Sequence, residues 1–542
     1  MRNVFLKFKQ KLNIESNHLI ILLTLYFGIV LNLSLWRFTL RHIELDFGGL
    51  LFLSSFVLLI LSLLYLLFAL MVVPYVTKPL ISILLFISSF VNFLMLRFGI
   101  FIDMDMLHNA FETNVHEASD FITLPSIIVF VLTGLIPALL LIFMSIKYNS
   151  LQKEVRKRAV FGITFLLISV IFGAFIYKDY ASFARNNREF RKLINPSNYI
   201  YAAFKYVKSL HEVEKTLIHL DKKAVHAPYR DDVITTVIFI VGETARAKNF
   251  SLYGYEKETN PLTAKQDIIV FKDVEACGTS TAISVPCMFS DKTRKDFKAS
   301  EAKYTENLVD LAAQSGYDVI WLENDSGCKG VCSRIYTENM RKIKNLKYCD
   351  DQYCKDEVLI YDLEERLKKI KKNTFIILHT IGSHGPAYYK RYPDEFKKFM
   401  PTCETADIQK CSKEETINTY DNTILYTDYI VSKTIDTIKK FSFRSSVLYV
   451  SDHGESLGEN NIYLHGFPYK IAPKEQLQVP MILWISENMK TMSYIDDKCV
   501  KKEARQKTYS HDNIFHSLIG LLEIKSKLYD KNMDILSSCR TK

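Results

Sequence analysis

The sequence predicts a two-part protein, an α-helical membrane domain followed by an α/β sandwich domain. Nearly all long apolar runs of the 542-residue chain lie before residue 180, which indicates membrane spans in that part. All ten cysteines lie after residue 276. Beyond about residue 231, short apolar strands alternate with longer amphipathic stretches, as in a sheet whose two faces are covered by helices. The chain is long enough for two or three domains, each with its own core.

Five stretches of the first part are apolar enough to cross about 30 Å of hydrocarbon, so we expect residues 1–178 to form a five-helix membrane domain. The first stretch follows a basic N-terminus, as the apolar part of a signal peptide would. It is too long for that role and no cleavage site of small residues follows, so we interpret it as an anchor. The expected spans are residues 18–36, 48–73, 79–101, 121–146 and 159–178.

Loop charges predict the orientation, because Lys and Arg favour the cytoplasmic side of a membrane. Basic residues crowd the N-terminus and the loop between the fourth and fifth spans. The loop between the third and fourth spans has no Lys or Arg and carries five carboxylates, so it should face outward. An odd number of spans then places the chain beyond residue 179 outside as well.

The acidic outer loop is expected to be helical, with Asn109, Thr113 and Glu117 at four-residue steps on one face. Such a helix is either a solvated interfacial element or a surface that caps the active site and contacts a lipid headgroup. Residues 179–230 are interpreted as a linker with amphipathic helices, which lie on the membrane surface or against the soluble domain. That domain is expected to comprise residues 231–542.

Charge restricts the class of partner. The formal net charge of +10 indicates either a solvated lysine-rich surface or attraction to anionic lipid headgroups. Nucleic acid is not an expected partner, because no basic run is interleaved with aromatic residues.

An even number of cysteines confined to the soluble part suggests disulfides and an oxidising compartment, in agreement with the loop charges. Sequential pairing is the simplest connectivity, although spacing alone does not prove it. The alternative is a zinc site made from the four cysteines between residues 328 and 354, whose spacers depart from the usual two-residue loops. Sequential pairing gives Cys277–Cys287, Cys328–Cys332, Cys349–Cys354, Cys403–Cys411 and Cys499–Cys539.

Chemically competent side chains follow several predicted strands, and ligands gather beyond the carboxyl ends of strands in such sheets. Glu243 follows the first strand, His384 follows the third, and Asp452, in the motif SDHGES, follows the fourth. His379 ends its own strand and is ranked below His384, because it could point into the core. The predicted strands are residues 233–241, 318–322, 374–379, 445–451 and 479–485.

Glu243, Asp452 and His453 supply two carboxylates and an imidazole, a mixed shell that suits Zn²⁺ and leaves a fourth position open. A Gly-Thr-Ser-Thr turn lies between Cys277 and Cys287, and a metal ion would turn a threonine hydroxyl there into an alkoxide. The helix after this turn would point backbone N–H groups at a phosphate. The competing interpretation of each motif alone is an ordinary turn with a hydrogen-bonded histidine; their joint occurrence favours a metal site.

His384 and His465 could bind a second zinc ion or phosphate oxygens, and could protonate a leaving group. Lys329, in the segment ENDSGCKG, would by default be a surface lysine.

The segments VGETAR, ACGTSTAISVPCMF, SHGPAYYKRYP and SDHGESLGENNIYLHG resemble the lipid A phosphoethanolamine transferases, a family that includes mobile colistin-resistance enzymes. The resemblance covers essentially the whole chain. It implies a catalytic domain of alkaline phosphatase-like (sulfatase-type) fold after five membrane helices. It also implies a Gram-negative inner-membrane enzyme with its catalytic domain in the periplasm, and we expect it to act as a monomer.

The resemblance implies zinc ligands at Glu243, Asp452 and His453, with Thr281 as both ligand and nucleophile. It selects Thr281 over the neighbouring hydroxyls of the turn, a choice that composition could not make. One zinc ion is expected to bind tightly, and a second could bind at the two later histidines. The expected substrate contacts are Ser326, Lys329, Glu455, Asn109, Thr113 and Glu117. Asp325 is a departure, since relatives can have Asn there, and the Cys328–Cys332 pair is absent from some relatives.

The expected reaction is a two-step transfer of phosphoethanolamine from phosphatidylethanolamine to a lipid A phosphate, by way of Thr281. Such capping lowers the negative charge of the outer surface and would confer resistance to cationic peptides such as polymyxin. The alternatives are transfer to a core sugar, a glycan or a protein, and a non-catalytic membrane sensor or scaffold, which should lack the metal set. A sulfatase is disfavoured, because the chain lacks a Cys or Ser in a C/S-x-P-x-R context. A lipoteichoic acid-type polymerase is disfavoured by the many cysteines.

Overall fold

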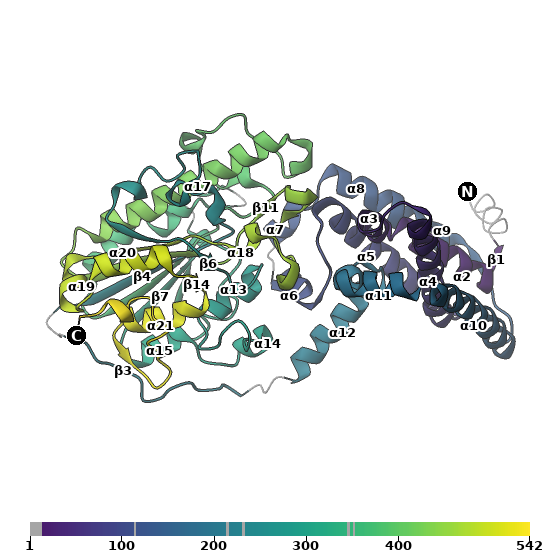
Figure 1. Cartoon of the computed structure of the whole chain (residues 1–542), viewed down its shortest axis with the longest axis horizontal. Helices are drawn as coiled ribbons and strands as arrows, with labels where there is room; N and C mark the ends of the chain where they lie inside the picture. Colours follow the sequence, from purple (N-terminus) through teal and green to yellow (C-terminus); the bar gives the residue numbers. More distant parts are fainter. Residues whose placement is uncertain are drawn as a thin grey trace. The chain divides into compact units, whose positions relative to one another are not determined.

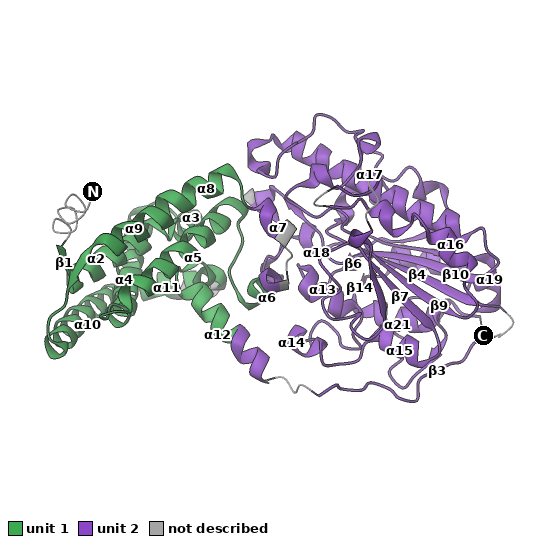
Figure 2. Ribbon diagram, turned by 180° about the vertical axis from the view of Figure 1, so that it is seen from behind, with its two compact units in different colours: residues 1–107, 122–205 green, residues 108–121, 206–542 purple. Residues whose placement is uncertain are grey.

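The structure, a computed structural model, describes residues 13–112, 115–212, 216–229, 233–343, 347–350 and 353–541. The chain forms two compact units, shown in different colours in Figure 2. The first unit comprises Met1–Leu107 and Ile122–Lys205, and the second comprises His108–Phe121 and Tyr206–Lys542. Residues 108–121 of the acidic loop therefore group with the sheet-containing unit.

The first unit is helical. Among the described residues, four helical segments are long and apolar enough to cross a membrane, or five if one bent pair counts as a single span. Leu70 and Ile163 are examples of the many large apolar side chains that these helices expose, as lipid-facing residues do. The four segments are α4 (Phe47–Met71), α5 (Thr77–Phe98), the stretch Leu124–Phe143 and α10 (Leu151–Phe175).

The bent pair replaces the single straight first span that the sequence predicts. Ser16–Val30 and Leu33–Arg41 meet at an angle of 49°. Asn32 lies in the break, and its side-chain amide donates to the carbonyls of Phe27 and Asn195, each at 2.8 Å. Because a polar side chain that satisfies backbone carbonyls can stabilise a break in a helix, hydropathy alone does not reveal the bend.

The second unit is built on a seven-stranded sheet in the order β5-β13-β10-β4-β9-β7-β8. The five strands from β10 to β8 are parallel, and β13 runs antiparallel to both of its neighbours. The bounds are β4 (Thr235–Gly242), β5 (Ile268–Phe271), β7 (Asp318–Glu323), β8 (Tyr336–Asn339), β9 (Thr374–His379), β10 (Arg444–Ser451) and β13 (Met481–Ile485).

All five strands predicted from the sequence are present in this sheet. Every residue of β4 and β10 is buried, which fits their β-branched, apolar sequences at the centre of the sheet. The prediction missed β5 and β8, the two edge strands. Each has only four residues; β5 is apolar but short, and β8 is polar and mostly exposed.

Helices cover both faces of the sheet, as the sequence predicts. Figure 1 shows α17 (Lys413–Ile438) on one face and α15 (Leu308–Gln314) and α21 (Asp512–Leu521) on the other. Side chains from the last two helices join those of β4, β9 and β10 in one hydrophobic core. This frame fixes the carboxyl ends of four neighbouring parallel strands at a common edge.

The ten cysteines form five disulfides in sequence order, the first with the second, the third with the fourth, and so on. The four cysteines of the alternative zinc site are therefore disulfide-bonded as well. The bonds are Cys277–Cys287, Cys328–Cys332, Cys349–Cys354, Cys403–Cys411 and Cys499–Cys539.

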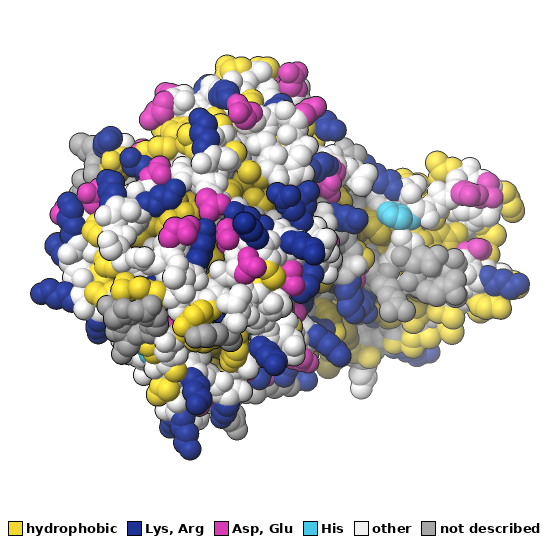
Figure 3. Space-filling model, turned by 60° about the vertical axis from the view of Figure 1, so that its left-hand side comes forward, with side chains coloured by type: hydrophobic (Ala, Val, Ile, Leu, Met, Phe, Trp, Pro, Cys, Tyr) yellow, Lys and Arg dark blue, Asp and Glu magenta, His cyan; other side chains and the backbone are white. Residues whose placement is uncertain are grey.

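The surface of the molecule mixes charges of both signs. Figure 3 shows Lys and Arg side chains spread over the face in view and interspersed with Asp and Glu, with no large patch of one sign.

Candidate active site

Two neighbouring strands deliver the central side chains of the site. Glu243 follows β4, and Asp452 and His453 follow β10; the two strands are parallel, with Gly242 paired to Ser451. The three side chains are fully buried. His453 Nε2 lies 3.4 Å from Glu243 Oε1 and 3.4 Å from Asp452 Oδ2. The strand register thus brings together two carboxylates and an imidazole that are far apart in sequence.

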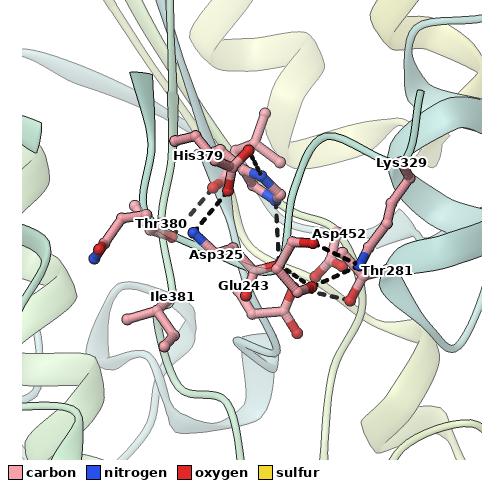
Figure 4. Close-up of polar contacts among 12 residues, drawn as sticks. Glu243, Thr281, Asp325, Lys329, His379, Thr380, Ile381 and Asp452 are labelled. Carbon is pink, nitrogen blue, oxygen red and sulfur yellow. Dashed lines mark hydrogen bonds and ion pairs between the residues drawn. The ribbon is translucent and has the colours of Figure 1, made fainter. Parts of the chain in front are cut away.

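Thr281 adds a hydroxyl to this group. It is the first residue of α13 (Thr281–Met288), and the Cys277–Cys287 disulfide joins the preceding turn to that helix. Its Oγ1 donates to Glu243 Oε2 at 3.1 Å and lies 3.5 Å from His453 Nε2. The Thr279 hydroxyl instead donates to the Phe467 carbonyl at 2.7 Å. The structure therefore gives a physical reason to choose Thr281 over Thr279. Figure 4 shows Thr281 near Asp452 and Lys329.

The donor set fits a metal ion. Asp452 Oδ1 accepts from the backbone N–H groups of Thr244 and His453, whereas its buried Oδ2 accepts no hydrogen bond from any described residue. His453 Nδ1 contacts the Gly454 carbonyl at 2.9 Å, which leaves Nε2 facing the carboxylates. A metal-ligating histidine is held in this way by a partner on its other nitrogen.

The electrostatics of the cluster support the same conclusion. Burial, followed by repulsion from Asp452 and Asp325, raises the pKa of Glu243 well above its usual range. Burial lowers the pKa of His453 to about 4, so the imidazole is neutral and can act as a ligand. Buried carboxylates that repel one another need a cation, and these residues could hold one.

His384 and His465 lie next to this group. The ring of His465 is 4.5 Å from that of His453 and 5.3 Å from that of His384, measured between centroids. His465 Nδ1 also lies 3.2 Å from Glu455 Oε2. Burial, with help from the nearby His465, lowers the pKa of His384 well below its usual range. These three side chains are thus placed beside the candidate metal ligands.

Lys329 is a buried residue and not the surface lysine expected by default, since its relative exposure is 6%. Its ammonium group donates to Ser326 Oγ at 2.6 Å, and that hydroxyl donates to Asp325 Oδ2 at 3.0 Å. Asp325 follows β7, so the chain of contacts starts at the same edge of the sheet. The structure places a positive charge near the end of β7, where an anionic substrate group could bind.

The outer loop is described only in part. Asn109 lies in α6 (Met104–Glu112), while the side chains of Thr113 and Glu117 lie outside the described residues. Sequence reasoning missed Asp120 in the same loop. Its Oδ2 accepts from Tyr353 Oη at 2.8 Å and from Arg391 Nη2 at 3.3 Å.

Arg391 links this loop to the site. It is fully buried, and its Nε donates to the carbonyl oxygen of His384 at 2.7 Å. Through Arg391, the carboxylate of Asp120 therefore connects with the backbone of a candidate active-site histidine. No short motif could have revealed the pair, because the two residues are 271 positions apart.

The fold and the side chains at its carboxyl edge define a class of protein, an enzyme with a sulfatase-type catalytic domain attached to membrane-spanning helices. The sulfatase family model matches residues 235–524, and the model described as "Phosphoethanolamine transferase EptA/EptB" matches residues 60–210.

Individual relatives specify the class further. Over 528 residues, the chain is 39% identical to Phosphoethanolamine transferase EptA of Escherichia coli K12, with 96% of each chain covered. It is 34% identical to Phosphatidylethanolamine transferase Mcr-1 of Escherichia coli over 466 residues, which is 83% of this chain and 84% of the relative. The solved structure of the integral membrane lipooligosaccharide phosphoethanolamine transferase A from Neisseria meningitidis matches with a TM-score of 0.95 at 39% identity, covering 97% and 99% of the two chains. The chain belongs to the phosphoethanolamine transferase family, so its resemblance to that family is confirmed, as are the enzyme class and the fold.

Proposed function

We propose that this enzyme transfers phosphoethanolamine from phosphatidylethanolamine to a phosphate of lipid A, through a covalent intermediate on Thr281. The observation that carries the proposal is the position of the Thr281 hydroxyl, 3.1 Å from Glu243 and 3.5 Å from His453 at the start of a helix. The relatives named for phosphoethanolamine transfer support the chemical group that is moved. The cysteine pairs and loop charges support a periplasmic location for the catalytic unit.

Glu243, Thr281, Asp452 and His453 are the residues that would hold a zinc ion. When bound, zinc would lower the pKa of the Thr281 hydroxyl and offset charge on the phosphoryl oxygens. The protein itself prepares the nucleophile. Glu243 accepts the hydrogen bond of the Thr281 hydroxyl, and the Cys277–Cys287 disulfide restrains the turn from which the threonine projects.

In the first step, Thr281 Oγ1 attacks the phosphorus of phosphatidylethanolamine. The bond between phosphorus and the glycerol oxygen breaks, diacylglycerol leaves with a proton, and phosphoethanolamine remains as an ester on Thr281. His465 is placed to deliver that proton, because Glu455 contacts its Nδ1. His384, kept neutral by burial, is placed to contact the phosphoryl oxygens or accept a proton.

In the second step, a phosphate oxygen of lipid A attacks the phosphorus of the ester. The bond from phosphorus to Thr281 Oγ1 breaks, which restores the threonine and leaves phosphoethanolamine on the acceptor. Lys329, held by Ser326, is placed to offset phosphoryl charge in both steps. The membrane unit retains the enzyme where both lipids reside. The product carries an added ammonium group, which weakens the attraction of the outer surface for polymyxin.

Product analysis tests this function. The purified full-length protein is incubated in vesicles that contain phosphatidylethanolamine and lipid A, and lipid A and diacylglycerol are followed by mass spectrometry. We expect both products to form, and Thr281→Ala to reduce both at least about a thousand-fold. Thr279→Ser is the matched control, because its hydroxyl can keep the bond to Phe467. Release of diacylglycerol by the Thr281→Ala protein at the wild-type rate would refute the proposal. Release of diacylglycerol without any modification of lipid A would refute the acceptor alone.

A further inference from the structure

A second group of ligand atoms lies on the other side of Glu243. Glu243, Asp325 and His379 each offer one atom, and all three atoms lie within 4.8 Å of one another. Asp325 follows β7 and His379 ends β9, so the group spans the adjacent strands β4, β9 and β7. Figure 4 shows Glu243 with Asp325 and His379 to its left and with Thr281 and Asp452 to its right. The mechanism above assigns no role to Asp325 or His379.

His379 is oriented as a metal ligand would be. Its ring is fully buried, and Nδ1 lies 2.9 Å from Glu323 Oε2. Its Nε2 makes no hydrogen bond to any residue that the structure describes and lies 3.8 Å from Asp325 Oδ2. A carboxylate on one nitrogen and an open second nitrogen is the arrangement that fixes metal-ligating histidines in proteins.

Glu323 makes contacts through both of its carboxylate oxygens. Its Oε2 also accepts from the Trp321 indole at 2.8 Å, and its Oε1 accepts from the backbone N–H of Asp325 at 2.7 Å. Glu323 therefore orients both His379 and Asp325. The register of the sheet supports this role, because Glu323 is paired with His379 across β7 and β9.

Asp325 contributes a buried carboxylate with an open oxygen. Its exposure is 3%, and one oxygen accepts from Ser326. The other, Oδ1, accepts no hydrogen bond within the described part of the chain. An unsatisfied, buried carboxylate oxygen is costly, so its persistence calls for a ligand.

The charge around this group is negative. Glu243, Asp325 and Asp452 are all buried carboxylates. The ring of His379 lies between two carboxylate contacts, at 2.9 Å from Glu323 Oε2 and 3.8 Å from Asp325 Oδ2. The pocket therefore attracts positive charge, which is either a proton on His379 or a metal ion.

We infer that Glu243, Asp325 and His379 form a second divalent-cation site, which shares Glu243 with the site at Thr281. Two carboxylates and one imidazole suit Zn²⁺ or Mn²⁺. The site differs from a zinc position at His384 and His465, because it uses neither histidine. A cation there would fix Asp325, and Asp325 accepts from the Ser326 hydroxyl that binds Lys329. The inference rests on the proposed function only in assuming that the first site also holds a metal ion.

Metal counting provides the first test. The full-length protein is stripped of metal, dialysed against buffered Zn²⁺ and analysed by mass spectrometry of its metal content. Asp325→Asn keeps the side-chain shape and removes the charge, and we expect it to lower the count by one zinc per chain. His379→Gln should do the same. Ser326→Ala, which removes the neighbouring hydroxyl but no ligand, should leave the count unchanged. Equal counts for the wild type and both ligand variants would overturn the inference.

Anomalous scattering at the zinc edge provides the location. Crystals of the zinc-loaded protein should show a peak among Glu243, Asp325 and His379, separate from any peak at Thr281. A map with no peak there would overturn the inference. Retention of the remaining zinc, together with a single cooperative thermal transition, shows that a variant is folded.

Measurement of the covalent adduct on Thr281 in the same sample distinguishes failure of the second cation site from failure of the proposed function. An adduct without the second peak refutes only the second site. A second peak without an adduct supports the site and refutes the proposed function.

Discussion

Buried charged residues lie at both ends of strand β10, but only those at its start form a pair of opposite charges. At its start, Arg444 pairs with Glu523, and Glu523 also accepts from Ser493 Oγ at 2.6 Å. Just beyond its end, Asp452 faces Glu243, a second carboxylate, and keeps one oxygen without a hydrogen bond from the described residues. The first group balances its charge within the protein. The second does not, and such imbalance marks a site that binds a cation.

This difference distinguishes buried charges that stabilise the fold from buried charges that bind a ligand for the reaction. A buried pair of opposite charges loses stability when one partner is removed, because the other charge is left unpaired. A buried group of like charges costs stability until its ligand binds, so removal of one member relieves repulsion in the metal-free protein. The following changes test the comparison.

The largest effect is expected from Asp452→Asn. Asparagine can keep the two backbone hydrogen bonds to Oδ1 and replaces only the unsatisfied oxygen. We expect the affinity for zinc to fall at least about a hundred-fold, because changes to outer-shell partners alone cost about 10–100-fold. Competition with a chelator measures the affinity. Unchanged affinity would remove Asp452 from the metal site.

At the other end of β10, Glu523→Gln should leave Arg444 as an uncompensated buried charge. The expected loss of unfolding free energy is about 3–5 kcal/mol, with little change in zinc content of the folded protein. Denaturant titration measures the first quantity. The double variant Arg444→Met/Glu523→Gln is the control, because it removes both charges and should be less unstable than the sum of the single changes. Additive losses would show that the two groups do not act as a pair.

The effect of Glu243→Gln on the unfolding free energy of the metal-free protein should have the opposite sign. We expect a gain in unfolding free energy, because the neutral amide removes a buried carboxylate that Asp452 and Asp325 repel. Because the pKa of Glu243 is raised in the folded state, the metal-free wild type loses stability as pH rises above the ordinary glutamate value of 4.5. The variant should lack this part of the pH dependence. A metal-free variant less stable than the wild type at neutral pH would contradict the comparison.

A third buried group, Asp120 with Arg391, should show an intermediate effect. Asp120→Asn weakens the ion pair that leads to the His384 carbonyl. We expect transfer to slow about ten-fold, as for other positioning residues, with no change in zinc content. Lys390→Gln is the control, because Lys390 Nζ lies farther from Asp120, at 3.6 Å. Equal rates for the two variants would mean that Arg391 does not position His384.

Sequence alone predicts much of the fold because long apolar strands determine it. The strand that precedes Glu243 and the one that precedes Asp452 each contain an apolar run and are buried throughout, so the residues just beyond their ends could be recognised as candidates. The edge strands β5 and β8 are short, and the bend at Asn32 depends on hydrogen bonds that hydropathy does not show.

The rest of the site depends on strand order, which no local pattern contains. Glu323 meets His379 only because β7 and β9 are neighbours. Asp120 meets Arg391 through a contact across 271 residues. The choice of Thr281 needed a family resemblance, and its physical reason, the bond from Thr279 to Phe467, appears only in three dimensions.

The central claim is that the Thr281 hydroxyl attacks phosphorus. Peptide-level mass spectrometry of the full-length protein, after incubation with phosphatidylethanolamine and no acceptor, tests it most directly. The account predicts one phosphoethanolamine group on Thr281, which disappears when lipid A is added. An adduct on another residue, or acceptor modification without any adduct in a rapid quench, would contradict it.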